Sequence, residues 1–143
     1  MMILDQILHN TTLLAAVLAW FVAQALKVIL TLLSEKRLDL GRMYGSGGMP
    51  SSHSALVTAM TTCIGKIYGF DAPIFAVSCV FSLVVMYDAA GVRRAAGKQA
   101  KAIKYLFTHV NVPLEENLKE LLGHTPAQVV CGAILGIFIG SFF

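Results

Sequence analysis

Two histidines stand at the starts of apolar segments that the sequence predicts to be helices. His53 lies in the stretch 45–55, where glycines and a proline precede the run that begins at Ser51, and His124 precedes the last apolar run. A histidine can move a proton near neutral pH, and a helix N-terminus favours an anion, above all a phosphate. Glycines let the backbone approach such a ligand closely. The alternative for 45–55 is a flexible loop with a serine cap and a solvated histidine.

Other polar residues are expected at the same ends of the predicted helices. Lys27 lies near the end of the first apolar run, and Asp88, Arg93 and Arg94 follow the third. Cations and helix ends would neutralise the charge of a transferring phosphoryl group, while one histidine attacks and the other protonates the leaving oxygen. Each residue also has a structural alternative: snorkelling for Lys27, pairing with an arginine for Asp88, and a lipid headgroup contact for Arg94. Neither histidine has a carboxylate cluster beside it, so no metal site and no cofactor are expected.

The elements that must position these residues are predicted to be membrane helices. The chain has 143 residues, of which 57% are hydrophobic and only 13% charged, and its mean hydropathy is +0.73. A soluble domain is about a quarter charged. We therefore expect residues 1–143 to form a single integral membrane domain, an all-α polytopic helix bundle. Its four spans are expected at about 11–33, 51–69, 72–90 and 125–143.

The stretch 91–125 is the longest segment outside the predicted spans. It opens as a basic helix with three lysines at 98, 101 and 104, which we expect at the cytoplasmic interface. A break at 110–113 and a short charged helix over 114–122 follow. In the last span, Gly132, Gly136 and Gly140 repeat every four residues, a spacing that suits close helix packing.

The distribution of basic residues predicts the orientation of the chain. Nine of the eleven lysines and arginines lie in the two longer loops, which an even number of crossings separates. The positive-inside rule places these loops and the histidines in the cytoplasm and both termini outside. The nine residues are Lys36, Arg37, Arg42, Arg93, Arg94, Lys98, Lys101, Lys104 and Lys119.

Three segments carry a family resemblance: Gly-Gly-Met-Pro-Ser-Ser-His-Ser-Ala (47–55), Asp-Ala-Ala-Gly-Val-Arg-Arg (88–94) and Leu-Gly-His-Thr-Pro-Ala-Gln-Val (122–129). Together they resemble the divergent branch of the type 2 phosphatidic acid phosphatases, a group related to acid phosphatases and vanadium-dependent haloperoxidases. The resemblance implies that His124 is the nucleophile, forming a phosphohistidine, and that His53 protonates the leaving alcohol. The phosphate-binding residues that it implies are Lys27, Ser51, Ser52 and Arg93, with Arg42 as a candidate for the arginine of the first motif.

The chain departs from the broader superfamily at two informative positions. Ser52 stands where the superfamily has a glycine, and Gln128 stands where an aspartate orients the nucleophile. A glutamine can hold an imidazole by a hydrogen bond but cannot stabilise an imidazolium by charge. Our hypothesis is that Asp88 takes the role of that aspartate from another helix.

The expected function is metal-independent hydrolysis of a lipid phosphate monoester. The resemblance implies phosphatidylglycerophosphate as the first candidate substrate, and phosphatidic acid or polyprenyl phosphates and diphosphates come next. One alternative is a non-catalytic protein that binds or translocates a lipid phosphate. Another is a structural subunit that uses the glycine face of the last span. The expected partners are the lipid substrate and membrane lipids, without nucleic acid, and four spans around a polar site favour self-association.

Overall fold

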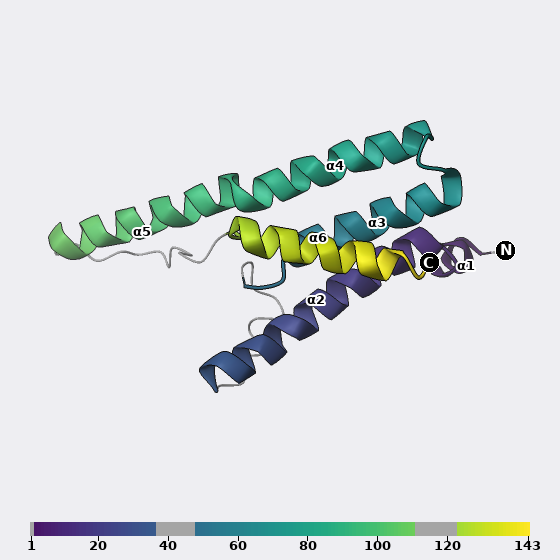
Figure 1. Cartoon of the computed structure of the whole chain (residues 1–143). Coiled ribbons are helices and arrows are strands. Elements are labelled where there is room, and N and C mark those ends of the chain that lie inside the picture. Colours follow the sequence, from purple (N-terminus) through teal and green to yellow (C-terminus); the bar gives the residue numbers. More distant parts are fainter. Residues whose placement is uncertain (1, 37–47, 111–122) are drawn as a thin grey trace.

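The computed structural model describes residues 2–36, 48–110 and 123–143, and every regular element in these ranges is an α-helix. The all-α prediction is therefore confirmed. The short helix expected over 114–122 lies outside the described residues. Figure 1 shows α1 and the end of α6 together at one end of the bundle. The helices are α1 (Ile3–Leu8), α2 (Thr11–Glu35), α3 (Ser52–Tyr68), α4 (Pro73–Ala90), α5 (Val92–Val110) and α6 (Pro126–Gly140).

The central element of the bundle is α3, which packs against α2, α4 and α6. Its small residues allow this, because Ala55 and Ala59 are fully buried and leave the neighbouring helices room to approach. Hydroxyl groups add polar contacts between helices: Thr61 bonds Ser82 of α4 at 2.8 Å. The packing fixes the N-terminal turn of α3, with its histidine, between three other helices.

The glycines of α6 lie against α3 of the same chain. A Cβ atom added to Gly136 would overlap Thr58 and the carbonyl group of Ala55, and one added to Gly132 would overlap the backbone of Ser51. Only glycine permits so close an approach. The prediction that this spacing serves helix packing is confirmed, and the face that a structural subunit would offer to a partner is occupied within the chain.

Among the described residues, two helical stretches are long and apolar enough to cross a membrane: Thr11–Glu35, with 25 residues, and Pro73–His109, with 37. The second joins α4 to α5. With 17 and 15 residues, α3 and α6 are shorter than the roughly 20 residues of a typical crossing. Four crossings therefore stay a prediction.

The outer face of α4 is strongly apolar. Val77, Phe81 and Val84 keep 63%, 51% and 61% of their surface exposed. Exposed apolar surface of this extent indicates contact with lipid or with another protein.

The basic helix predicted after the third span is confirmed as α5. It continues α4 in nearly the same direction and extends beyond the bundle (Figure 1). Its side chains from Lys101 to His109 are all exposed. A position at the cytoplasmic interface is not tested by this arrangement and stays a prediction.

Candidate functional site

The site lies where the N-terminal ends of α3 and α6 meet. Each end carries a hydroxyl cap: Ser51 accepts a hydrogen bond from the backbone N–H of Ser54 at 3.3 Å, and Thr125 accepts one from that of Gln128, also at 3.3 Å. The backbone N–H of Ser51 donates to the carbonyl group of Gln128 at 3.0 Å and so ties the two ends together. Two helix N-termini therefore direct partial positive charge into one region.

His124 is held by the end of α4 as well as by its own segment. It is 2% exposed, and its backbone N–H donates to the carbonyl group of Ala89 at 2.8 Å. The preceding residue, Gly123, has φ +85°, and a Cβ atom there would overlap the backbone of Arg93 and Arg94. A glycine is needed at this position for both its conformation and its space.

The amide of Gln128 fixes the tautomer of His124. Its Oε1 atom accepts a hydrogen bond from the backbone N–H of Thr125 at 3.0 Å, which completes a capping box and identifies this atom as the oxygen. The same atom lies 3.3 Å from Nδ1 of His124. Because an amide oxygen only accepts, Nδ1 carries the proton, and Nε2 is left with a free lone pair.

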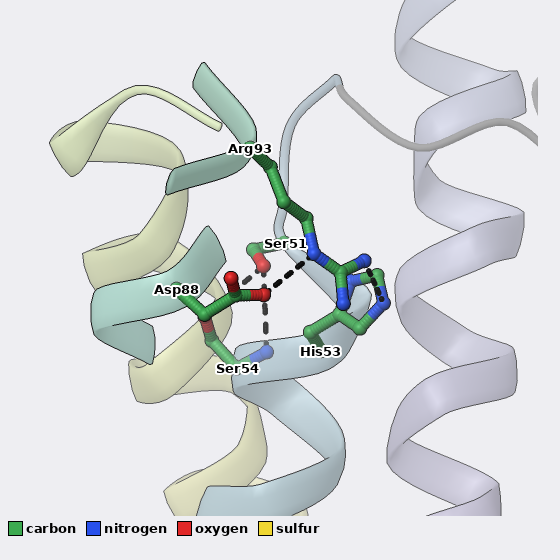
Figure 2. A network of polar contacts seen from close by, with 5 residues as sticks. All are labelled: Ser51, His53, Ser54, Asp88 and Arg93. Carbon is green, nitrogen blue, oxygen red and sulfur yellow. Dashed lines mark hydrogen bonds and ion pairs between the residues drawn. The ribbon is translucent and has the colours of Figure 1, made fainter. Parts of the chain in front are cut away.

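His53 is held by an arginine that is itself held by a carboxylate. Nε of Arg93 donates to Asp88 at 2.6 Å, and a second guanidinium nitrogen lies 3.3 Å from Nε2 of His53 (Figure 2). A guanidinium group only donates, so Nε2 of His53 accepts and the proton of the neutral ring lies on Nδ1. Both neutral rings therefore carry their proton on Nδ1 and a lone pair on Nε2.

The two rings lie close to each other, with centroids 6.0 Å apart and planes inclined by 63°. Two ring nitrogens, Nδ1 of His53 and Nε2 of His124, are buried and form no hydrogen bond of normal geometry within the part of the chain that the structure describes, although the backbone of Gly48 is close enough to His124 to raise its pKa. One is a donor and the other an acceptor by the assignments above. A buried polar atom without a partner is costly, so each of these nitrogens is suited to contact a ligand.

Lys27 faces the bundle and does not snorkel to the interface. It is 2% exposed, and its ammonium group donates to Oε1 of Gln24 at 2.8 Å and to Oγ of Ser52 at 3.2 Å. The aliphatic part of its side chain lies near the backbone of Gly48, where an added Cβ atom would be 3.7 Å from Cδ. A buried ammonium group beside two histidines is a strong anion-binding element.

Burial is the main cause that lowers the pKa of His124 below its ordinary value, and the nearby Lys27 ammonium group lowers this pKa further. The hydrogen bond to Gln128 raises the pKa and so opposes these two effects in part. The neutral ring is therefore the dominant form at neutral pH. A neutral imidazole is what nucleophilic attack requires.

The structure brings seven of the predicted site residues into this region, and Arg42 lies outside the described residues. The hypothesis for Asp88 finds no support: among the described contacts, its carboxylate pairs with Arg93, and Gln128 is the residue that bonds the ring of His124. Ser51 acts as a helix cap. Sequence reasoning missed Gln24 as a partner of Lys27, although the two share a helical stripe. The seven are Lys27, Ser51, Ser52, His53, Asp88, Arg93 and His124.

No group of three or more His, Cys, Asp or Glu side chains is placed to hold a metal ion in the ranges that the structure describes. The site is instead built from histidines, cations and helix ends.

Comparison with known proteins identifies a family that covers most of the chain. Residues 8–139 match the family described as the Divergent PAP2 family. The chain is also 39% identical to a protein of Bacillus subtilis (strain 168) named "Uncharacterized membrane protein YuiD", over 94% of each chain. No solved structure shows a significant match.

Proposed function

The chain belongs to the Divergent PAP2 family, and we propose that it is a membrane lipid phosphate phosphatase that acts through a phosphohistidine. The PAP2-related group includes phosphatases. The observation that carries the proposal is the pair of buried ring nitrogens, Nδ1 of His53 and Nε2 of His124, which form no hydrogen bond of normal geometry among the described residues. They supply one proton donor and one nucleophile on neighbouring rings.

In the first step, Nε2 of His124 attacks the phosphorus atom of the lipid phosphate. The P–N bond forms as the bond between phosphorus and the lipid oxygen breaks. When the phosphate is bound, the Arg93 guanidinium turns to its oxygens and His53 takes up a second proton on Nε2; this imidazolium gives its Nδ1 proton to the leaving alcohol and becomes neutral. Lys27, Arg93 and the N-terminal ends of α3 and α6 neutralise the equatorial oxygens of the phosphoryl group. Gln128 holds the attacking ring in the correct tautomer.

In the second step, water hydrolyses the phosphohistidine. His53, now without its Nδ1 proton, takes a proton from the water as it attacks phosphorus, and the P–N bond breaks. Inorganic phosphate leaves, and both histidines return to their starting forms. The reaction consumes one water and needs no further reactant.

We propose phosphatidylglycerophosphate as the first substrate to test, because its phosphate monoester is made on the cytoplasmic side. The site lies at the end of the bundle opposite α1 and the end of α6 (Figure 1). With both termini outside, this end faces the cytoplasm, as the basic residues of α5 also favour. Phosphatidic acid and polyprenyl phosphates are the other candidates.

The alternative is a protein that binds or translocates a lipid phosphate without cleaving it. The buried Lys27 and the Asp88–Arg93 pair suit binding alone, but a binder would not need a donor nitrogen on one histidine beside an acceptor nitrogen on the other.

Phosphate release separates the two functions. The purified protein in detergent would be given phosphatidylglycerophosphate, phosphatidic acid and a polyprenyl diphosphate, each with a chelator, beside His124→Ala. Release that survives the chelator and disappears in His124→Ala supports the phosphatase. A folded protein that binds these lipids and releases no phosphate supports the alternative.

A further inference from the structure

A second feature lies apart from the histidines, between the outer halves of α2 and α3. An open groove with a volume of about 410 Å³ runs between them, within the range of roughly 300–1,000 Å³ that is typical of small-molecule sites. Leu13 and Val17 of α2 and Leu56 and Met60 of α3 line it. These four side chains make its walls apolar.

The groove lies on the same helix faces as the phosphate-binding residues. On α3, Ser52, Leu56 and Met60 follow one another at intervals of four residues and share a face. Ser52 bonds Lys27 of α2 at 3.2 Å, so this face of α3 is turned toward α2. The site and the groove are therefore two parts of one α2–α3 interface.

Helix geometry gives the separation of the two parts. Leu56 comes four residues after Ser52, roughly 6 Å along α3, and Val17 lies ten residues before Lys27, roughly 15 Å along α2. Gln24 and Trp20 lie between these two levels of α2. Along α2, the side chains thus pass from a cation, through a buried amide and an exposed indole ring, to the apolar groove.

We propose that this groove binds an acyl chain of a glycerophospholipid phosphate whose headgroup lies at Lys27 and the histidines. The order of polarity along the interface matches such a lipid: phosphate, then glycerol and ester groups, then hydrocarbon. A polyprenyl phosphate would instead place hydrocarbon next to its phosphate, against the polar Gln24. The inference rests on the proposed function for its headgroup and adds the class of its tail.

The groove continues to Asn10 and Tyr68 at the far ends of the two helices. Tyr68 lies sixteen residues after Ser52, roughly 24 Å along α3. A short-chain lipid phosphate would reach the near end of the groove at Leu56 but would not extend past Val17. The proposal therefore predicts that changes in the groove act only on long-chain substrates.

Photo-crosslinking tests the proposal without depending on catalysis. A phosphatidic acid with a diazirine midway along one acyl chain would be incorporated with His124→Ala protein in phosphatidylcholine vesicles. We expect crosslinks at Val17, Leu56 and Met60, lost with the matching diacylglycerol and in a protein that also carries Lys27→Met. Crosslinks spread over the exposed faces of α4 and α6, or equal yields with diacylglycerol, would overturn it. Groove labelling by a diazirine-bearing polyprenyl phosphate but not by phosphatidic acid would overturn the assignment to acyl chains.

Hydrolysis gives a second test. Val17→Trp fills the groove and should lower the hydrolysis of long-chain phosphatidic acid at least roughly tenfold, the scale of contacts in hydrophobic pockets, while dihexanoyl phosphatidic acid is hydrolysed as before. Val130→Trp, on the exposed face of α6, is the matched control and should change neither. Equal losses of hydrolysis for the long-chain and the dihexanoyl lipid would contradict the binding of an acyl chain in the groove. An unmodified protein that hydrolyses neither lipid would instead contradict the proposed function, and the crosslinks alone would then decide the inference.

Discussion

Oε1 of Gln128 lies 3.3 Å from Nδ1 of His124, and His124 precedes Gln128 by four residues in the chain. The same oxygen also accepts the backbone N–H of Thr125 and completes the capping box of α6. A residue that begins the helix therefore also orients the proposed nucleophile. This explains how a glutamine can stand where the superfamily has an aspartate: it fixes the tautomer by geometry and supplies no charge.

Substituting Gln128 should separate orientation from charge. Gln128→Ala removes both hydrogen bonds, and we expect kcat to fall roughly 10–100-fold, the usual cost of losing a group that orients a functional histidine. Gln128→Glu keeps an oxygen that accepts both bonds, so its activity should stay close to that of the unmodified protein above neutral pH. Phosphate release at saturating lipid measures both. Full activity in Gln128→Ala would contradict the orienting role.

The Asp88–Arg93 pair should act as a unit on His53. Asp88→Asn weakens the hold on Arg93, and we expect a loss of activity of roughly tenfold. If the carboxylate acts through Arg93, the same change made in an Arg93→Ala protein should cost almost nothing further. A double-mutant cycle on kcat/KM measures this coupling. Losses that simply multiply would show that Asp88 acts by another route, such as a direct effect on His124.

The helices of this chain could be predicted well from sequence, because apolar runs bounded by glycine, proline and capping residues define them. The runs predicted at 11–33, 51–69, 72–90 and 125–143 correspond to α2, α3, α4 and α6. The number of membrane crossings could not be fixed in the same way. A helix of 17 residues such as α3 owes its apolar character partly to burial in the bundle, and sequence does not distinguish this from lipid contact.

The members of the site could also be predicted, but not their pairing. Lys27, His53 and His124 were predicted to lie together because all three fall at the same ends of the predicted helices. The partner of each side chain depends on helix rotation and on close backbone contacts, such as that of Gly123 with the start of α5. Two signals pointed to the partner of His124: the family resemblance placed Gln128 where an aspartate orients the nucleophile, and the spacing of Thr125 and Gln128 is that of a capping box.

Lys27 should matter for activity far more than for folding. Lys27→Met keeps a similar volume and removes a buried charge, a change that is often neutral or stabilising. We expect activity to fall roughly 10²–10³-fold, as when a charge-stabilising donor is lost, with little change in Tm. Lys66→Met, at the other end of α3, is the control and should retain activity. A large fall in Tm with normal activity per folded molecule would make Lys27 structural.

The pH dependence should follow the lowered pKa of His124. Only the neutral ring can attack, so activity is lost as the pH falls through this pKa, and the acidic limb should lie below pH 6.5, the ordinary value. Lys27 is one cause of the lowering, so Lys27→Met should move the limb to higher pH. The pH profile of kcat/KM between pH 4.5 and 8, which reports the pKa values of the free protein, measures the shift in both proteins. A limb at or above 6.5 in the unmodified protein would contradict the assignment.

Gly136→Ala should destabilise the bundle. In an exposed helix the change would gain about 1 kcal/mol from helix propensity, but here the new Cβ atom overlaps Thr58 and the backbone of Ala55. Overpacking costs roughly 1–3 kcal/mol, so we expect a lower Tm in detergent. Val130→Ala, on the exposed side of α6, should leave Tm nearly unchanged. An unchanged or raised Tm in Gly136→Ala would show that α3 and α6 lie further apart.

The most direct measurement of the central claim is the capture of the phosphorylated enzyme. The protein would be mixed with a lipid carrying a radiolabelled terminal phosphate, quenched in alkali within milliseconds to seconds, and mapped by peptide mass analysis. The account predicts a phosphoryl group on His124 that is stable to alkali, labile to acid and absent in His124→Ala. Steady release of phosphate with no label on His124, or with equal labelling of His124→Ala protein, would contradict it.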